Sequence, residues 1–173
     1  MTAMEVLIGV FILVIGLAGF FRAIVSQTVL NEHSRNFTLA MNDSRRVLER
    51  IRQQNTSDAC VTPSALPPQL PVAYLSWDAW LADLNGGGGK SIRPDSNELI
   101  AVTCQKADNS GFCGAGDDPI HLTIAVCWRH RSRTIGDCTW NGNLLIENNP
   151  GASGDPNVVN SPAQLQTVMS CRR

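Results

Sequence analysis

The chain has 173 residues, a formal net charge of −1, 43% hydrophobic residues and 17% charged residues. This length suffices for one folded core with an extension, but not for two domains that each have a full core. The balanced charge argues against a dedicated nucleic-acid-binding protein and against a polybasic membrane-binding surface. The apolar residues are unevenly distributed, because a large share of them lies in the first 25 positions.

Residues 6–21 form an uncharged apolar run, which Arg22 interrupts and residues 23–25 extend. A membrane-spanning helix needs about 20 apolar residues, and the long stem of Arg22 lets its charge reach the interface. The run is therefore predicted to be a helix that lipid or other helices surround. A cleaved secretory signal fits less well, since such a signal begins with positive charge whereas this segment begins with Glu5.

Glu5 is the one carboxylate close to this apolar run, and it has two interpretations. In the first, it pairs with the α-amino group of Met1, from its own chain or from a neighbouring copy, because a buried carboxylate needs a cation. Pairing between copies would let Glu5 fix the register of neighbouring helices. In the second, Glu5 lies at the membrane interface, reaches water and complements the positive end of the helix dipole.

Residues 26–53 keep helical character without a proline and change from uniformly apolar to amphipathic. We predict one long helix over residues 1–54, with residues 1–25 as its membrane or filament-core segment. Apolar residues at steps of seven, four, seven and three predict one stripe that packs on a sheet. They are Leu30, Phe37, Met41, Leu48 and Ile51.

The second part of the chain, residues 55–173, is predicted to form a globular head that begins with a proline-rich linker at 62–71. A short helix is expected at 75–84, with Ser76 as its cap and Trp77, Trp80, Leu81 and Leu84 on one side. Strands are expected at 98–105, 120–128, 143–147 and 164–171, and residues 120–128 alternate most clearly. The predicted fold class is α+β, a long N-terminal helix packed on a small antiparallel sheet.

Six cysteines lie beyond the apolar segment, and none has the spacing of a metal site. An even number in an exported head indicates disulfides in an oxidising compartment. We predict the local pairs Cys104–Cys113 and Cys127–Cys138 and the distant pair Cys60–Cys171; the alternative is that one or more are buried thiols.

Other motifs give no catalytic, cofactor-binding or metal-binding residues, and no enzyme is predicted. Gly86 to Gly89 followed by Lys90 and Ser91 lacks the first glycine of a phosphate-binding loop and follows a helix, which indicates a flexible turn. One basic patch is present, and two interpretations are open. It either binds DNA or an anionic surface or, as is more common, is a solvated hairpin tip or an intersubunit salt-bridge patch. Its residues are Arg129, His130, Arg131 and Arg133.

The N-terminus carries a resemblance. The segment Met-Thr-Ala-Met-Glu-Val-Leu-Ile at residues 1–8, followed by the apolar run, resembles the mature N-terminus of type IV pilins and pseudopilins, which are methylated at residue 1. The helical stretch that ends at residues 48–52 is similar to minor pilins of the pilus-modification type. The basic leader of the family is absent, and we expect the sequence to be the mature form. The proline common in such helices is also absent, so that Gly16 and Gly19 either mark where the helix loosens in a filament or allow close helix approach.

The resemblance implies a structural subunit of a type IV pilus-like filament, which polymerises with copies of itself or other pilins through its N-terminal helix. It implies storage in the inner membrane with a periplasmic head, processing by a prepilin peptidase and the pilus assembly machinery, and an extracellular filament as the final location. Alternatives are a minor or tip pilin, a type II secretion pseudopilin, and a non-polymerising single-pass membrane protein with a periplasmic binding head. Adhesion, motility, secretion and DNA uptake are not separated by the sequence.

Overall fold

The structure is a computed structural model that describes residues 2–54, 74, 76–91, 98–108, 111–113, 117–130, 132–147 and 161–170. Its first element, α1 (Ala3–Gln54), is a helix of 52 residues, which confirms the predicted long helix. The chain divides into two compact units, an N-terminal unit (Met1–Asn36) and a head unit (Phe37–Arg173). Residues 37–54 of α1 thus belong to the head unit, whereas the sequence placed the boundary after residue 54. The predicted linker at 62–71 lies outside the described residues.

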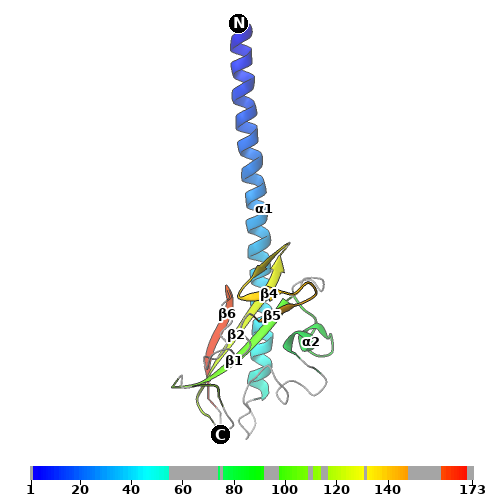
Figure 1. The fold of residues 1–173 in the computed structure, drawn as a ribbon, viewed down its shortest axis with the longest axis vertical. Helices are drawn as coiled ribbons and strands as arrows, with labels where there is room; N and C mark the ends of the chain where they lie inside the picture. The colour runs from blue at the N-terminus through cyan, green and yellow to red at the C-terminus, as the bar shows by residue number, and fades with distance from the viewer. Residues whose placement is uncertain are drawn as a thin grey trace. The chain divides into compact units, whose positions relative to one another are not determined.

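The head unit contains a four-stranded antiparallel sheet with β2 (Ile120–His130) at its centre (Figure 1). Strand β1 (Glu98–Lys106) pairs with β2 along its whole length on one side. On the other side, β3 (Arg133–Ile135) and β6 (Ala163–Met169) pair with successive parts of β2. The predicted strands at 98–105, 120–128 and 164–171 are confirmed, with ends that differ by one or two residues.

The sheet and the end of α1 share the main hydrophobic core. Alternate residues of β2 point into it, as the alternating pattern predicted, and all of them are buried. They are Ile120, Leu122, Ile124, Val126 and Trp128. The helix contributes Ala40, Val47, Leu48 and Ile51 to the same core.

The face of α1 that is buried differs from the predicted stripe. Leu30 is 63% exposed and Phe37 is 37% exposed, although Leu48 and Ile51 are buried as expected. At 100° per residue, the buried face is rotated by about 60° from the stripe. It includes small and polar side chains that a search for apolar residues leaves out, and these let the helix approach the sheet. The buried residues are Ala40, Asp43, Ser44, Val47, Leu48 and Ile51.

Helix α2 (Trp77–Ala82) follows the predicted pattern except at its end. Its cap Ser76 accepts a hydrogen bond from the amide of Ala79 at 3.1 Å, which satisfies one otherwise unpaired donor. Trp77, Trp80 and Leu81 are buried. The prediction for Leu84 was wrong, because the chain leaves the helix at Asp83 and Leu84 is 80% exposed.

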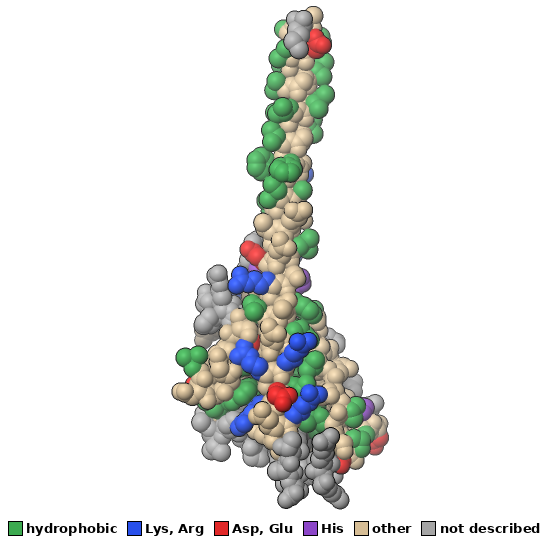
Figure 2. Space-filling view, turned by 180° about the vertical axis from the view of Figure 1, so that it is seen from behind, with side chains coloured by type: hydrophobic (Ala, Val, Ile, Leu, Met, Phe, Trp, Pro, Cys, Tyr) green, Lys and Arg blue, Asp and Glu red, His purple; other side chains and the backbone are tan. Residues whose placement is uncertain are grey.

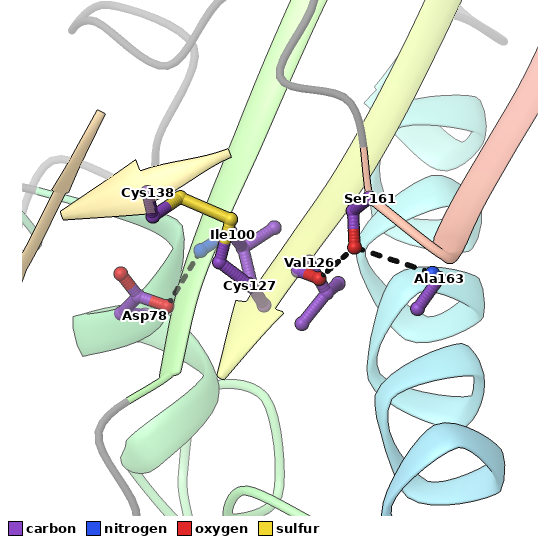
Figure 3. The surroundings of a disulfide bond; sticks show 7 residues. All are labelled: Asp78, Ile100, Val126, Cys127, Cys138, Ser161 and Ala163. Atoms are coloured by element: carbon purple, nitrogen blue, oxygen red, sulfur yellow. Dashed lines mark hydrogen bonds between the residues drawn. A yellow bond between two sulfur atoms is a disulfide. The ribbon is translucent and has the colours of Figure 1, made fainter. Parts of the chain in front are cut away.

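A two-stranded ribbon, β4 (Cys138–Trp140) and β5 (Leu145–Glu147), forms a second, smaller core with the opposite face of the main sheet. Cys127 of β2 is bonded to Cys138 of β4, so that a disulfide joins the ribbon to the central strand (Figure 3). From the sequence, an element was expected to pack on one face of the sheet only. In the structure, the β4–β5 ribbon also packs on part of the second face, which explains why both Ala125 and Cys127 are buried.

The disulfides Cys104–Cys113 and Cys127–Cys138 are both present, as predicted. Each closes a local loop, and the two partners are separated by 9 and 11 positions, respectively. The third predicted pair, Cys60–Cys171, lies outside the described residues.

Candidate assembly surface

The N-terminal unit presents an apolar surface over residues 6–21. Its most apolar 18-residue window has a mean hydropathy of 2.5, and none of that window is buried. Phe11, Leu13 and Phe20 are each at least 60% exposed. By length and composition, this helix can cross a membrane. A helix that is apolar on all sides needs an apolar environment on all sides, supplied by lipid or by other helices.

Glu5 lies in the first turn of α1, and its side chain is exposed. Its amide donates a hydrogen bond to the carbonyl oxygen of Thr2 at 3.0 Å. A carboxylate in this position complements the positive end of the helix dipole. Met1, the predicted partner of Glu5, lies outside the described residues, so the pairing stays a prediction.

Gly16 and Gly19 lie within the continuous α1 helix. A Cβ atom added at either position would have no neighbour within 4 Å, so the single chain does not use these glycines for close packing. Both expectations for them, loosening and close approach, concern a helix surrounded by copies and stay predictions.

One arginine of the basic patch at the β2–β3 hairpin makes a contact within the fold. The guanidinium of Arg129 lies 4.3 Å from the centre of the Trp140 ring, which attaches it to the β4–β5 ribbon by a cation–π contact. Trp128 is fully buried in the main core and offers no surface for base stacking. His130 pairs with Arg133 across the hairpin, and Arg131 lies outside the described residues.

The glycine loop after α2 is anchored to α1, whereas the sequence indicated a flexible turn. Arg46 donates hydrogen bonds from Nη1 to the carbonyl oxygens of Gly87, at 2.9 Å, and Gly89, at 2.6 Å. Its Nη2 donates to Asp43 at 2.6 Å and to the hydroxyl of Ser91. Asp43 also accepts from the amide of Ser91, at 2.9 Å to Oδ2. In a phosphate-binding loop, backbone amides point toward the anion. In this loop, backbone carbonyl oxygens point toward Arg46, an arrangement that suits a cation.

Glu98, at the start of β1, is a buried acid close to this loop. It is 6% exposed, and neither carboxylate oxygen accepts a hydrogen bond from a described residue. Burial, followed by the negative charge of Asp43, raises the pKa of Glu98 to about 9, although nearby Lys90 opposes the shift. Lys90 itself lies 3.7 Å from Asp78, whose carboxylate accepts the amide of Ile100 at 3.0 Å (Figure 3). Glu98 is therefore neutral at pH 7.

We predict that the head unit loses stability as the pH rises from about 5 to 9. In the unfolded chain Glu98 ionises near its usual pKa of 4.5, whereas the folded state retains the proton up to about 9. Each pH unit in that interval lowers the free energy of unfolding by up to about 1.4 kcal/mol. The Glu98→Gln variant, which is always neutral, should show a flatter pH dependence in thermal unfolding between pH 5 and 9. The exposed Glu49→Gln variant is the control, and parallel curves for wild type and Glu98→Gln would contradict the prediction.

The head unit contains a polar cluster around Asp43 and Arg46 that was not predicted from the sequence. The burial of Asp43 could have been predicted from its position on the core-facing side of α1, three residues after Ala40 and four before Val47. Within the described part of the chain, no group of three acidic, histidine or cysteine residues can hold a metal ion. No protein-family profile, curated protein or solved structure matches this chain.

Proposed function

We propose that this protein is a structural subunit of a type IV pilus-like extracellular filament, which polymerises through the N-terminal part of α1. The observation that carries the proposal is the apolar surface of residues 6–21, exposed on all sides and preceded by a single carboxylate at Glu5. Figure 2 shows hydrophobic side chains along both edges and the visible face of this part of the helix. Identical helices that bury this surface against one another would form a heterologous contact that does not close, which is the geometry of a fibre.

Two further features support an exported subunit. The described part of the head unit has two disulfides, which persist in oxidising compartments. Its core also includes Ala40, Val47, Leu48 and Ile51 of α1, so the same helix that carries the apolar surface is part of the folded head. Before assembly, the apolar segment would lie in the inner membrane with the head on the periplasmic side; after assembly, it would lie among copies in the filament.

The proposal is tested by mass spectrometry of filaments sheared from the surface of the producing cells. We expect peptides of this chain in the sheared fraction, with a methylated amine on Met1. A dominant share would identify a major subunit, whereas a trace would identify a minor or tip pilin. If the chain stays in the membrane fraction, with an unmethylated Met1 behind a retained leader, it is a single-pass membrane protein and the proposal is wrong.

A further inference from the structure

Helix α2 and the segment that follows it bring an amine and a carboxylate together inside the head unit. The Nζ atom of Lys90 lies 3.7 Å from Oδ1 of Asp78, and the two side chains are only 14% and 17% exposed, respectively. Lys90 Nζ also donates to the backbone carbonyl oxygen of Glu98 at 3.4 Å. Most ion pairs between lysine and aspartate lie in water, which screens them and lets both side chains move. This pair is instead largely shielded from solvent.

The carboxylate of Asp78 is held by a backbone donor. Asp78 lies in the first turn of α2, and its Oδ1 accepts a hydrogen bond from the amide of Ile100 on β1 at 3.0 Å (Figure 3). A donor at this oxygen withdraws electron density from the carboxyl carbon. It also stabilises the negative charge that an attacking nucleophile places on the oxygen. The carboxyl group of Asp78 is therefore oriented and polarised for attack by a neighbouring amine.

Glu98 places a neutral acid next to this pair. It is 6% exposed, and its carboxyl group interacts electrostatically with both Lys90 and Asp78. Burial and the negative charge of Asp43, which lies on α1, raise the pKa of Glu98 to about 9. An acid whose pKa is close to the working pH can both give and take a proton, as general acid–base catalysis requires. Glu98 can thus carry protons between the amine and the carboxylate.

Fixed proximity favours a reaction between these two groups. Two reactants held in a productive orientation react as if one of them were present at about 10⁵–10⁸ M. Exclusion of water also protects an amide product from hydrolysis. Lys106 and Asp117 form a comparison pair with nearly the same separation, 3.8 Å, but these side chains are 42% and 31% exposed. Solvent reaches that pair, so the same distance does not favour the same chemistry there.

We propose that Lys90 and Asp78 form an intramolecular amide bond, with Glu98 as the proton carrier. The ammonium group of Lys90 first gives a proton, through Glu98, to the carboxylate of Asp78. The neutral amine then attacks Cγ of Asp78, the C–N bond forms, and one carboxyl oxygen leaves as water. The two protons that the nitrogen loses are the two protons of this water, and Glu98 ends the reaction protonated. The reaction therefore balances without an oxidant, a reductant or a co-reactant.

The bond would be a covalent link in the head that reductants do not break. Asp78 and Lys90 are 12 positions apart, so the bond closes a loop that contains the end of α2 and the glycines 86–89. The reaction needs only the folded head unit. It therefore does not depend on polymerisation of the N-terminal helix, and its test is independent of the test for filaments.

Intact-mass spectrometry of the full chain, purified in detergent and with its disulfides reduced, tests the proposal. After allowance for any methyl group on Met1, we expect a mass lower than that of the sequence by one water molecule. Chymotrypsin cuts after Trp80 and Leu81, between the two joined residues. It should release a branched peptide in which the side chain of Lys90 is linked to that of Asp78.

Two variants test the roles of the residues. Lys90→Arg keeps the positive charge but has no amine, and Glu98→Gln keeps the shape of the side chain but cannot carry a proton. Each folded variant should have the full mass of its own sequence. Lys106→Arg, from the exposed comparison pair, is the matched control and should retain the deficit of one water molecule.

Three results would overturn the proposal. They are a folded wild-type chain of full mass, a water deficit that persists in Lys90→Arg, and a bond that forms as completely in folded Glu98→Gln as in wild type. Thermal unfolding identifies a variant that fails to fold. In that case the wild-type mass and the branched peptide decide by themselves, because both are measured on the unaltered chain.

Discussion

The Glu5→Ala variant is expected to enter filaments at least about tenfold less than the wild-type chain, while its amount in the membrane fraction stays within about twofold. The side chain of Glu5 is exposed in the single chain and contributes nothing to the head core, so its loss leaves the fold intact. In a filament, however, the amine of Met1 from an incoming subunit would lie among apolar side chains without a carboxylate. An unpaired charge in such a place costs several kcal/mol, and about 1.4 kcal/mol already corresponds to a tenfold change.

Quantitative mass spectrometry of the sheared and membrane fractions measures both amounts. Glu32→Ala provides a matched control, because Glu32 is an exposed acid on the same helix but lies beyond the apolar run. If Glu5→Ala is incorporated as well as wild type, the carboxylate has no role in assembly, and the central argument for a pilin-like subunit fails.

The Asp43→Ala variant is expected to lose about 2–3 kcal/mol of unfolding free energy. Asp43 is fully buried and neutralises Arg46, and it accepts the amide of Ser91. Its removal leaves the guanidinium without a counter-charge and this amide without its acceptor. The loss is smaller than for a completely buried pair, because 35% of the Arg46 side chain reaches solvent. Denaturant unfolding of the full chain in detergent, followed by tryptophan fluorescence, measures the change.

A double-mutant cycle with Arg46→Ala separates the pair from the rest of the fold. Because the two side chains are in direct contact, the double variant should be more stable than the sum of the single changes predicts, by about 1–2 kcal/mol. Asn42→Ala, an exposed neighbour on α1, should change stability by less than about 0.5 kcal/mol. Strict additivity of Asp43→Ala and Arg46→Ala would show that the contact between these two side chains adds nothing to the stability of the head.

Local periodicity accounts for the elements that were predicted correctly. The alternation of residues 120–128 placed β2 and its core face, since side chains of a strand alternate with a period of two. The lack of proline and the uniform apolarity of residues 6–21 likewise predicted α1 and its exposed surface. These patterns are short-range, so one sequence is enough to identify them.

The cluster around Arg46 was not predictable in the same way. Arg46 and Gly87 are 41 positions apart, and Asp43 and Ser91 are 48 positions apart, so their contacts depend on the assembled fold. The run of glycines predicts a flexible turn, whereas Gly87 is required by packing, because a Cβ atom there would lie 2.5 Å from Leu81 Cα. Asp43 was overlooked because a polar residue on a helix is usually exposed, and only its partners make its burial tolerable.

The positions of the two disulfides also limit how far the head can be stretched. Each loop that a disulfide closes cannot unravel under tension, and 9 and 11 residues would otherwise lengthen the chain by about 30 Å and 40 Å when fully extended. Both loops involve one of the two long strands at the centre of the head, because Cys104 lies on β1 and Cys127 on β2. A force applied to the ends of the chain would therefore unfold the head without extending these two loops. Single-molecule pulling should show a shorter extension before the disulfides are reduced than after their reduction.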